Sequence, residues 1–128
     1  MILLLISCAS ATIENSDTTG YIYRKGSVVR NYPMSFDDAW AAANTALRRL
    51  NLSLMYSMKY NNTGSLAAGN ASGRRAEIEL VRINKDVTSI AVKGCLLDAY
   101  FHPEVIHEEI MKAQNSAEDR KGELNNKL

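Results

Sequence analysis

The chain has 128 residues, with 15 Lys and Arg against 14 Asp and Glu, and a formal net charge of +1. This length predicts a single domain with one hydrophobic core. The near-neutral charge excludes both a strongly basic nucleic-acid-binding protein and an acidic, solvating chain. No stretch approaches the roughly 20 consecutive apolar residues of a membrane-spanning helix. The two cysteines are too few for a disulfide scaffold or a four-thiolate zinc site, and no motif indicates a bound cofactor.

The chain begins with a short apolar run, residues 2–6, followed by Ser7 and Cys8. An apolar stretch that leads to a small residue is typical of a secretory leader, although this run is short and lacks the usual positive flank. Residues 5–8 (LISC) resemble a bacterial lipobox, in which the leader is cut before the cysteine and the sulfur carries a diacylglyceryl group. The resemblance predicts that residues 1–8 are a truncated leader with a start upstream of Met1, and that Cys8 is the lipid attachment site. The alternative is a disordered N-terminus after a short hydrophobic start.

Residues 9–19 are rich in Ser, Thr, Asn and small residues and lack apolar periodicity, which predicts a flexible tether. A tether after an anchoring cysteine is the layout of a lipid-anchored protein that faces the periplasm. By resemblance to known sorting patterns, Ala9 in place of Asp after Cys8 favours the outer membrane. If Cys8 carries lipid, Cys95 has no disulfide partner in the chain, and its apolar neighbours favour a buried, inert thiol.

The segment 20–33 is predicted to be extended because its Tyr and Val residues favour strands. Gly26 in its middle indicates either a bulge or a turn that divides it into two short strands.

Residues 35–50 are the clearest predicted helix. Ser35 is a good N-cap, and Asp37 and Asp38 would lie at the positive end of the helix dipole. Asn51 suits a left-handed exit from the helix. The apolar residues recur in steps of three and four and form one stripe: Phe36, Trp40, Ala43, Leu47 and Leu50.

Up to four strands follow, separated by short turns. Residues 52–60 alternate between apolar and polar side chains, which predicts a half-buried strand with Leu52, Leu54, Tyr56, Met58 and Tyr60 on one side. The small residues of 65–70 predict a short strand near a sheet edge. Residues 75–83 alternate and would pair with 87–93, and residues 94–100 either continue the sheet or form a crossing loop.

A second helix is predicted to begin at Pro103, with Ile106, Ile110 and Ala113 as its apolar stripe. Beyond Gln114 the chain is polar, so residues 114–128 are expected to be a tail or a frayed helix. Residues 20–113 would then form one α+β domain. Short turns favour a mostly antiparallel sheet of four or five strands, with the two helices covering one face in a two-layer sandwich.

The order of these features resembles a group of small bacterial envelope lipoproteins that are classed as a domain of unknown function. The resemblance covers about residues 5–113, and no activity can be carried over from it. The matching pieces are the lipobox (LISC, 5–8), the Tyr-rich strand with its glycine (YIYRKG, 21–26), the capped helix start (SFDDAW, 35–40) and the strand ending in glycine (IAVKG, 90–94).

The only candidates for nucleophilic chemistry are Cys95 with Asp98, His102 and His107. A thiol enzyme needs the cysteine and a histidine in hydrogen-bond contact, and nothing in the spacing indicates that contact. A metal site is the other possibility, since Glu104, His107 and Glu108 fall at i, i+3 and i+4 on one helical face. We expect this face to be solvated, with the carboxylates favouring the charged form of His107. No metal or catalytic residue is therefore assigned.

The sequence as a whole favours a non-catalytic lipoprotein of the bacterial cell envelope that binds another envelope protein or a wall component. Its expected contacts are the membrane, through Cys8, and an unknown partner that is not a nucleic acid. The alternatives are a small soluble α+β domain, or a thiol or metal site around Cys95, His102 and His107.

Overall fold

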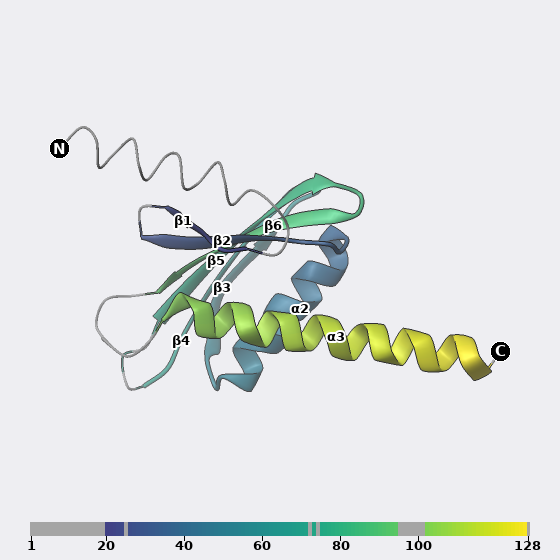
Figure 1. The fold of residues 1–128 in the computed structure, drawn as a ribbon. Helices are drawn as coiled ribbons and strands as arrows, with labels where there is room; N and C mark the ends of the chain where they lie inside the picture. Colours follow the sequence, from purple (N-terminus) through teal and green to yellow (C-terminus); the bar gives the residue numbers. More distant parts are fainter. Residues whose placement is uncertain (1–19, 25, 72, 74, 95–101, 128) are drawn as a thin grey trace.

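A computed structural model describes residues 20–24, 26–71, 73, 75–94 and 102–127, and side chains are described as far as residue 116 (Figure 1). The tether, Cys8 and Cys95 lie outside the described residues. The elements follow in the order β1 (Ile22–Arg24), β2 (Ser27–Tyr32), α2 (Phe36–Arg49), β3 (Ser53–Lys59), β4 (Thr63–Gly69), β5 (Arg75–Asn84), β6 (Val87–Gly94) and α3 (Pro103–Lys127).

All the strands described belong to one antiparallel sheet in the order β1-β2-β6-β5-β4-β3. The sheet has six strands, so the expected four or five is wrong. The difference arises at Gly26, which has φ 70° and forms a turn that folds the segment 20–33 back on itself. Because Ile22 then pairs with Val29, both halves of this segment enter the sheet as separate strands.

The strand of small residues, β4, lies inside the sheet between β3 and β5, and β3 forms the edge. It therefore lies near an edge, as predicted, and is paired on both sides. One of its small residues, Gly64, matters for packing against α2. A Cβ atom on Gly64 would collide with the ring of Trp40 and touch that of Phe36. The glycine lets α2 approach the sheet closely.

Helix α2 begins and ends as its sequence predicts. The Asp38 N–H donates to the Ser35 hydroxyl at 3.2 Å, and Asn51 leaves the helix with φ 59°. The centre of the buried face lies slightly to one side of the predicted stripe, since Trp40 and Leu50 are only partly buried. The fully buried positions of the helix are Phe36, Ala39, Ala42, Ala43, Ala46 and Leu47.

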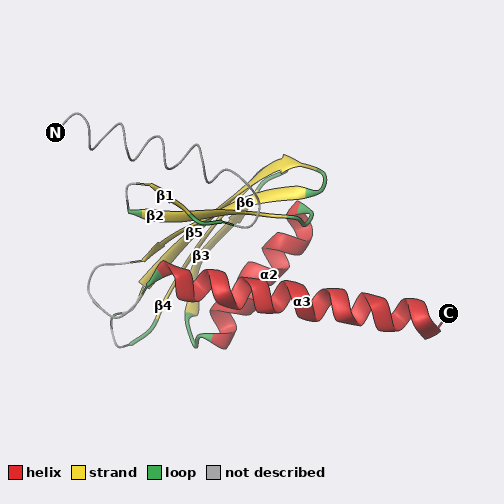
Figure 2. Ribbon diagram, viewed as in Figure 1, coloured by secondary structure: helices red, strands yellow, loops and turns green. Residues whose placement is uncertain are grey.

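Helix α3 packs across α2, and both helices cover the same face of the sheet (Figure 2). Ile106, Ile110 and Ala113 are buried as predicted, and they join one core with α2 and with β4, β5 and β6. The α3 helix continues to Lys127. Among the residues described, neither helix is long and apolar enough to cross a membrane. The architecture is the expected two-layer α+β arrangement, and neither of the described helices covers the opposite face of the sheet.

Candidate functional site

Strand β3 does not bury one side, contrary to the prediction from its alternating sequence. Leu52 before it is buried, but every residue of β3 is exposed. A bulge between Leu54 and Tyr56 breaks the alternation: Leu54 pairs with Ala68 in the core, whereas Tyr56 pairs with Ala67 on the opposite face. Because the side-chain period of a strand is two, one extra residue turns the rest of β3 over.

The bulge directs a row of large apolar side chains onto the face opposite the two described helices. Met58 lies opposite Ser65, the Tyr60 N–H donates to the Thr63 carbonyl at 2.8 Å, and Thr63 lies opposite Val81. We call the four apolar members the β3 patch: Tyr56, Met58, Tyr60 and Val81, exposed by 49%, 38%, 56% and 43% respectively. Ile83, in the bulge at the end of β5, is also exposed.

The β3 patch is chemically suited to binding. The hydroxyls of both Tyr56 and Tyr60 donate to the Met58 sulfur, Tyr60 at 3.8 Å. Methionine is flexible and polarisable, and tyrosine combines a large apolar ring with a polar tip. Such residues are enriched at the centres of protein interfaces, whereas scattered single apolar residues are ordinary surface. Tyr56 and Met58 on β3, with Tyr60 directly after it, are exposed together and therefore indicate a contact surface.

A groove of about 370 Å³ runs beside the β3 patch across the same face of the sheet. Its floor is low because small residues occupy the central positions of β4 and β6, while Tyr56 and charged residues line it. The groove gives the apolar patch a polar border, as is usual at protein interfaces. The small residues are Ser65, Ala67 and Ala91, and the charged ones are Glu77, Glu79 and Lys93.

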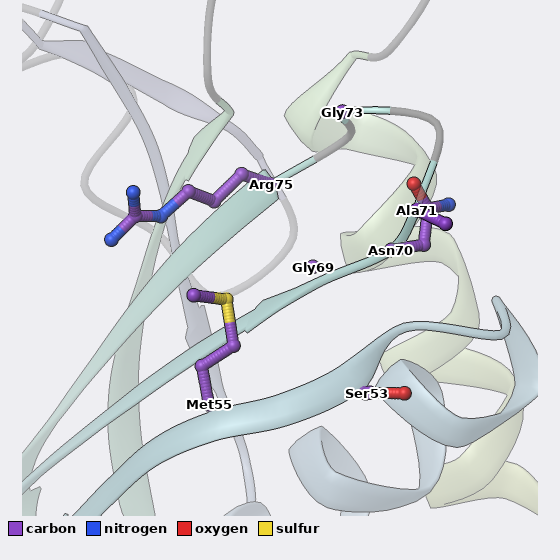
Figure 3. A pocket seen from close by; sticks show the side chains of 7 residues that line it. All are labelled: Ser53, Met55, Gly69, Asn70, Ala71, Gly73 and Arg75. Carbon is purple, nitrogen blue, oxygen red and sulfur yellow. The ribbon is translucent and has the colours of Figure 1, made fainter.

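A second pocket, of about 470 Å³, lies at the end of the sheet where β4 turns into β5 (Figure 3). The side chains of Met55 and Arg75 lie on the same side of Gly69 in this view, and the pocket is lined by Ser53, Met55, Gly69, Asn70, Ala71, Gly73 and Arg75. Because Gly69 has no side chain, it leaves space beside the guanidinium of Arg75 and the thioether of Met55. This pocket adjoins the free edge of β3, so it extends the same exposed region.

A hydrogen-bonded polar cluster is buried between α3 and β2. The Tyr32 hydroxyl lies 2.6 Å from His107 Nδ1, and His107 Nε2 lies 2.8 Å from the Val28 carbonyl oxygen. Since a carbonyl only accepts, Nε2 carries the proton and Nδ1 accepts from Tyr32. Burial lowers the pKa of His107 to about 4, against the opposing effect of the hydrogen bond to Val28. Burial likewise raises the pKa of the Tyr32 hydroxyl.

Aromatic and cationic side chains surround this cluster. The ring of Tyr32 stacks on that of His107, and the Arg30 guanidinium lies 5.6 Å from the centre of the Tyr21 ring and 5.4 Å from that of Tyr32. The Arg30 Nε atom is buried and has no hydrogen-bond partner among the described residues. The positive charge of Arg30 also lowers the pKa of His107. The arrangement is a packed structural contact that holds α3 on β2.

The residues predicted as a solvated face do not share one environment. His107 is fully buried, so the expectation that it lies on a solvated face and favours its charged form is wrong. Glu104 accepts a hydrogen bond from Tyr23 at 3.2 Å, and Glu108 and His102 are exposed. Because both nitrogens of His107 are engaged, it is not available to act with Cys95 or His102 as base or ligand. Among the described residues, no three His, Cys, Asp or Glu side chains gather as a metal site would require.

The sequence contained a signal for the burial of His107. It stands next to Ile106 and three residues before Ile110, so it falls on the apolar stripe of α3. The partner Tyr32 could not be found in this way, because the pairing joins residues 75 positions apart. The β3 patch was missed because the bulge at Leu54 and Tyr56 leaves no mark in the alternation of the sequence.

The fold and the exposed face define a small α+β domain, in which two helices back a six-stranded antiparallel sheet whose other face carries the β3 patch. Residues 1–113 match the family described as a protein of unknown function (DUF3568). The chain belongs to this family. No curated protein matches the sequence.

Proposed function

We propose that the protein is a non-catalytic binding module of the bacterial cell envelope, anchored through a lipid on Cys8, that recognises another protein through the β3 patch. The exposed cluster of Tyr56, Met58, Tyr60 and Val81 is the observation that carries this proposal. Burying such side chains against a partner would remove a large apolar area from water, at roughly 25 cal/mol per Å².

The position of the patch supports a role in recognition. Both helices pack on the other face of the sheet, so the β3 patch takes no part in the core. Tyr56, Met58 and Val81 stand on strands, which hold a binding surface more rigidly than loops do, and Tyr60 directly follows β3. The groove beside it adds carboxylates of Glu77 and Glu79 and the amine of Lys93, which would fix the orientation of a partner.

The anchor is supported by the resemblance of residues 5–8 to a lipobox and by the polar tether that follows. The decisive measurement is the intact mass of the protein isolated from native membranes, expressed with its upstream DNA. A mass that begins at Cys8 and includes a lipid adduct supports the anchor. An unmodified chain that retains Met1 contradicts it.

The binding role is tested by crosslinking in solubilised envelopes followed by pull-down. Tyr56→Ser and Met58→Ser are expected to reduce recovery of the partner. Leu54→Ser is the matched control, because Leu54 lies on the same strand with 50% exposure but on the other face. Equal recovery from all three variants and the parent would refute the β3 patch as the binding surface. Recovery with purified cell-wall sacculi in place of a protein would support the alternative, a wall component.

A further inference from the structure

We propose that β3 pairs with β3 of a second copy of this chain, edge to edge and antiparallel, so that two six-stranded sheets join into one. This inference rests on the proposed function, because it names a partner for the surface described there. The partner is identified by the chemistry of the strand itself: an extended segment that is uncharged up to Lys59, with the small Ser57 between the apolar Tyr56 and Met58.

The backbone at this edge is suited to pairing. The sheet order ends at β3, and no described strand lies beyond it. The Tyr60 N–H points inward to Thr63. Because backbone groups alternate between the two sides of an antiparallel strand, the N–H and C=O of Ser57 and Lys59 point outward to the free edge. The other edge, β1, has only three residues and offers a much shorter ladder.

A two-fold axis at Ser57 gives the most favourable register. Two strands centred there exchange both hydrogen bonds of a Ser57 pair, as in the closely bonded pairs of an antiparallel ladder. Tyr56 of each copy then lies opposite Met58 of the other, on the face opposite α2 and α3. A sulfur beside an aromatic ring is favourable. The two β3 patches would merge into one, and the axis makes the interface self-complementary.

Charge does not oppose this register. Between Asn51 and Lys59 the chain carries no charged side chain. The two Lys59 residues would stand four positions apart along the ladder, about 13 Å, which exceeds the screening length of roughly 8 Å in physiological salt. Lys59 is also neutralised within its own copy by Asp37, at 2.8 Å.

The bulge at Leu54 and Tyr56 shortens the regular part of β3. Bulges and a lysine are common means of protecting a sheet edge, so the ladder is expected to be short and the dimer weak in dilute solution. Two copies anchored in one membrane would meet at a much higher effective concentration, which favours pairing.

The test uses the full chain carrying Cys8→Ser, so that no lipid contributes, and measures mass by sedimentation equilibrium from micromolar to millimolar concentration. The parent is expected to approach twice the monomer mass of 14.2 kDa. Ser57→Glu and Ser57→Lys should each weaken dimerisation by at least about tenfold, because like charges would face each other across the axis. Mixing the two variants in equal amounts should restore the dimer.

Ser53→Glu is the control, because Ser53 lies on the same strand outside the central ladder and should leave dimerisation unchanged. Circular dichroism of each variant confirms that the fold is kept. A parent that stays monomeric at every concentration would overturn the proposal, as would single variants that dimerise normally or a mixture that fails to restore the dimer. The pull-down with Tyr56→Ser and Leu54→Ser measures the proposed function separately, so a monomer would leave that function standing.

Discussion

At the scale of single residues, the contact between Tyr32 and His107 shows how a buried polar pair can be accommodated in a small core. Among the described residues, Tyr32, Thr88 and His107 carry a polar side-chain group and are fully buried. Thr88 donates to the Met34 carbonyl at 3.1 Å, and His107 uses both of its ring nitrogens. Since unsatisfied buried groups are costly and satisfied ones are nearly neutral, the pair mainly fixes which part of α3 meets β2.

Replacing Tyr32 by Phe should therefore destabilise the protein although the ring is kept. The substitution leaves His107 Nδ1 buried without a donor, at a cost of about 1–3 kcal/mol in the free energy of unfolding. Urea denaturation measures this change. Tyr23→Phe is the control, because Tyr23 is exposed and its bond to Glu104 spans 3.2 Å, so its loss should matter little. Equal effects of the two substitutions would contradict the buried hydrogen bond.

The lowered pKa of His107 predicts a loss of stability in mild acid. Above about pH 6.5, His107 is neutral in both the folded and the unfolded protein. Below this pH the unfolded chain binds a proton on His107, whereas the folded protein does so only near its own pKa of about 4. Stability should therefore fall as the pH drops through this window, by ~3 kcal/mol in total. His107→Gln can accept from Tyr32 and donate to Val28 without titrating. The difference between the two unfolding curves from pH 7 to pH 4 isolates the effect, and parallel curves would argue against it.

At the scale of elements, the close approach of α2 to β4 depends on Gly64. A methyl group there would meet the rings of Trp40 and Phe36, so Gly64→Ala should destabilise the protein by about 1–3 kcal/mol, the usual cost of overpacking. Thermal or urea unfolding measures it. Adding Trp40→Leu to the same chain should recover part of the loss, because the smaller side chain makes room. A double variant that is less stable than the additive sum would show that steric crowding is not the cause.

The elements that sequence reasoning predicted correctly are those whose local signals agree with their tertiary surroundings. Helix α2 has a cap, acidic residues in its first turn and a regular stripe, and β5 alternates Ala76, Ile78 and Leu80 toward the core as expected. The errors occurred where a single residue changes the geometry. Gly26 adds a strand, and the bulge at Leu54 and Tyr56 turns β3 over. Neither outcome is decided by periodicity, because each depends on how neighbouring strands pair.

The candidate site was less predictable than the fold for a related reason. An exposed face is recognised only after the sheet order is known, since the same Tyr and Met residues of β3 could equally line a core. The residues singled out from the sequence were histidines and carboxylates, whose spacing along one helix is visible without a structure. Of these, His107 belongs to the core and not to a site.

At the scale of the whole molecule, stability and recognition are expected to depend on opposite faces of the sheet. Ile110 is fully buried between α3 and the sheet, so Ile110→Ala should cost about 2–5 kcal/mol in unfolding free energy. Met58→Ser, on the exposed face, should change stability by no more than about 0.5 kcal/mol. In the envelope pull-down, Met58→Ser should reduce recovery of the partner. Ile110→Ala should leave recovery unchanged, provided that it is assayed where it remains folded. A large loss of stability from Met58→Ser would mean that the β3 patch is part of the core, and the case for a free binding surface would fail with it.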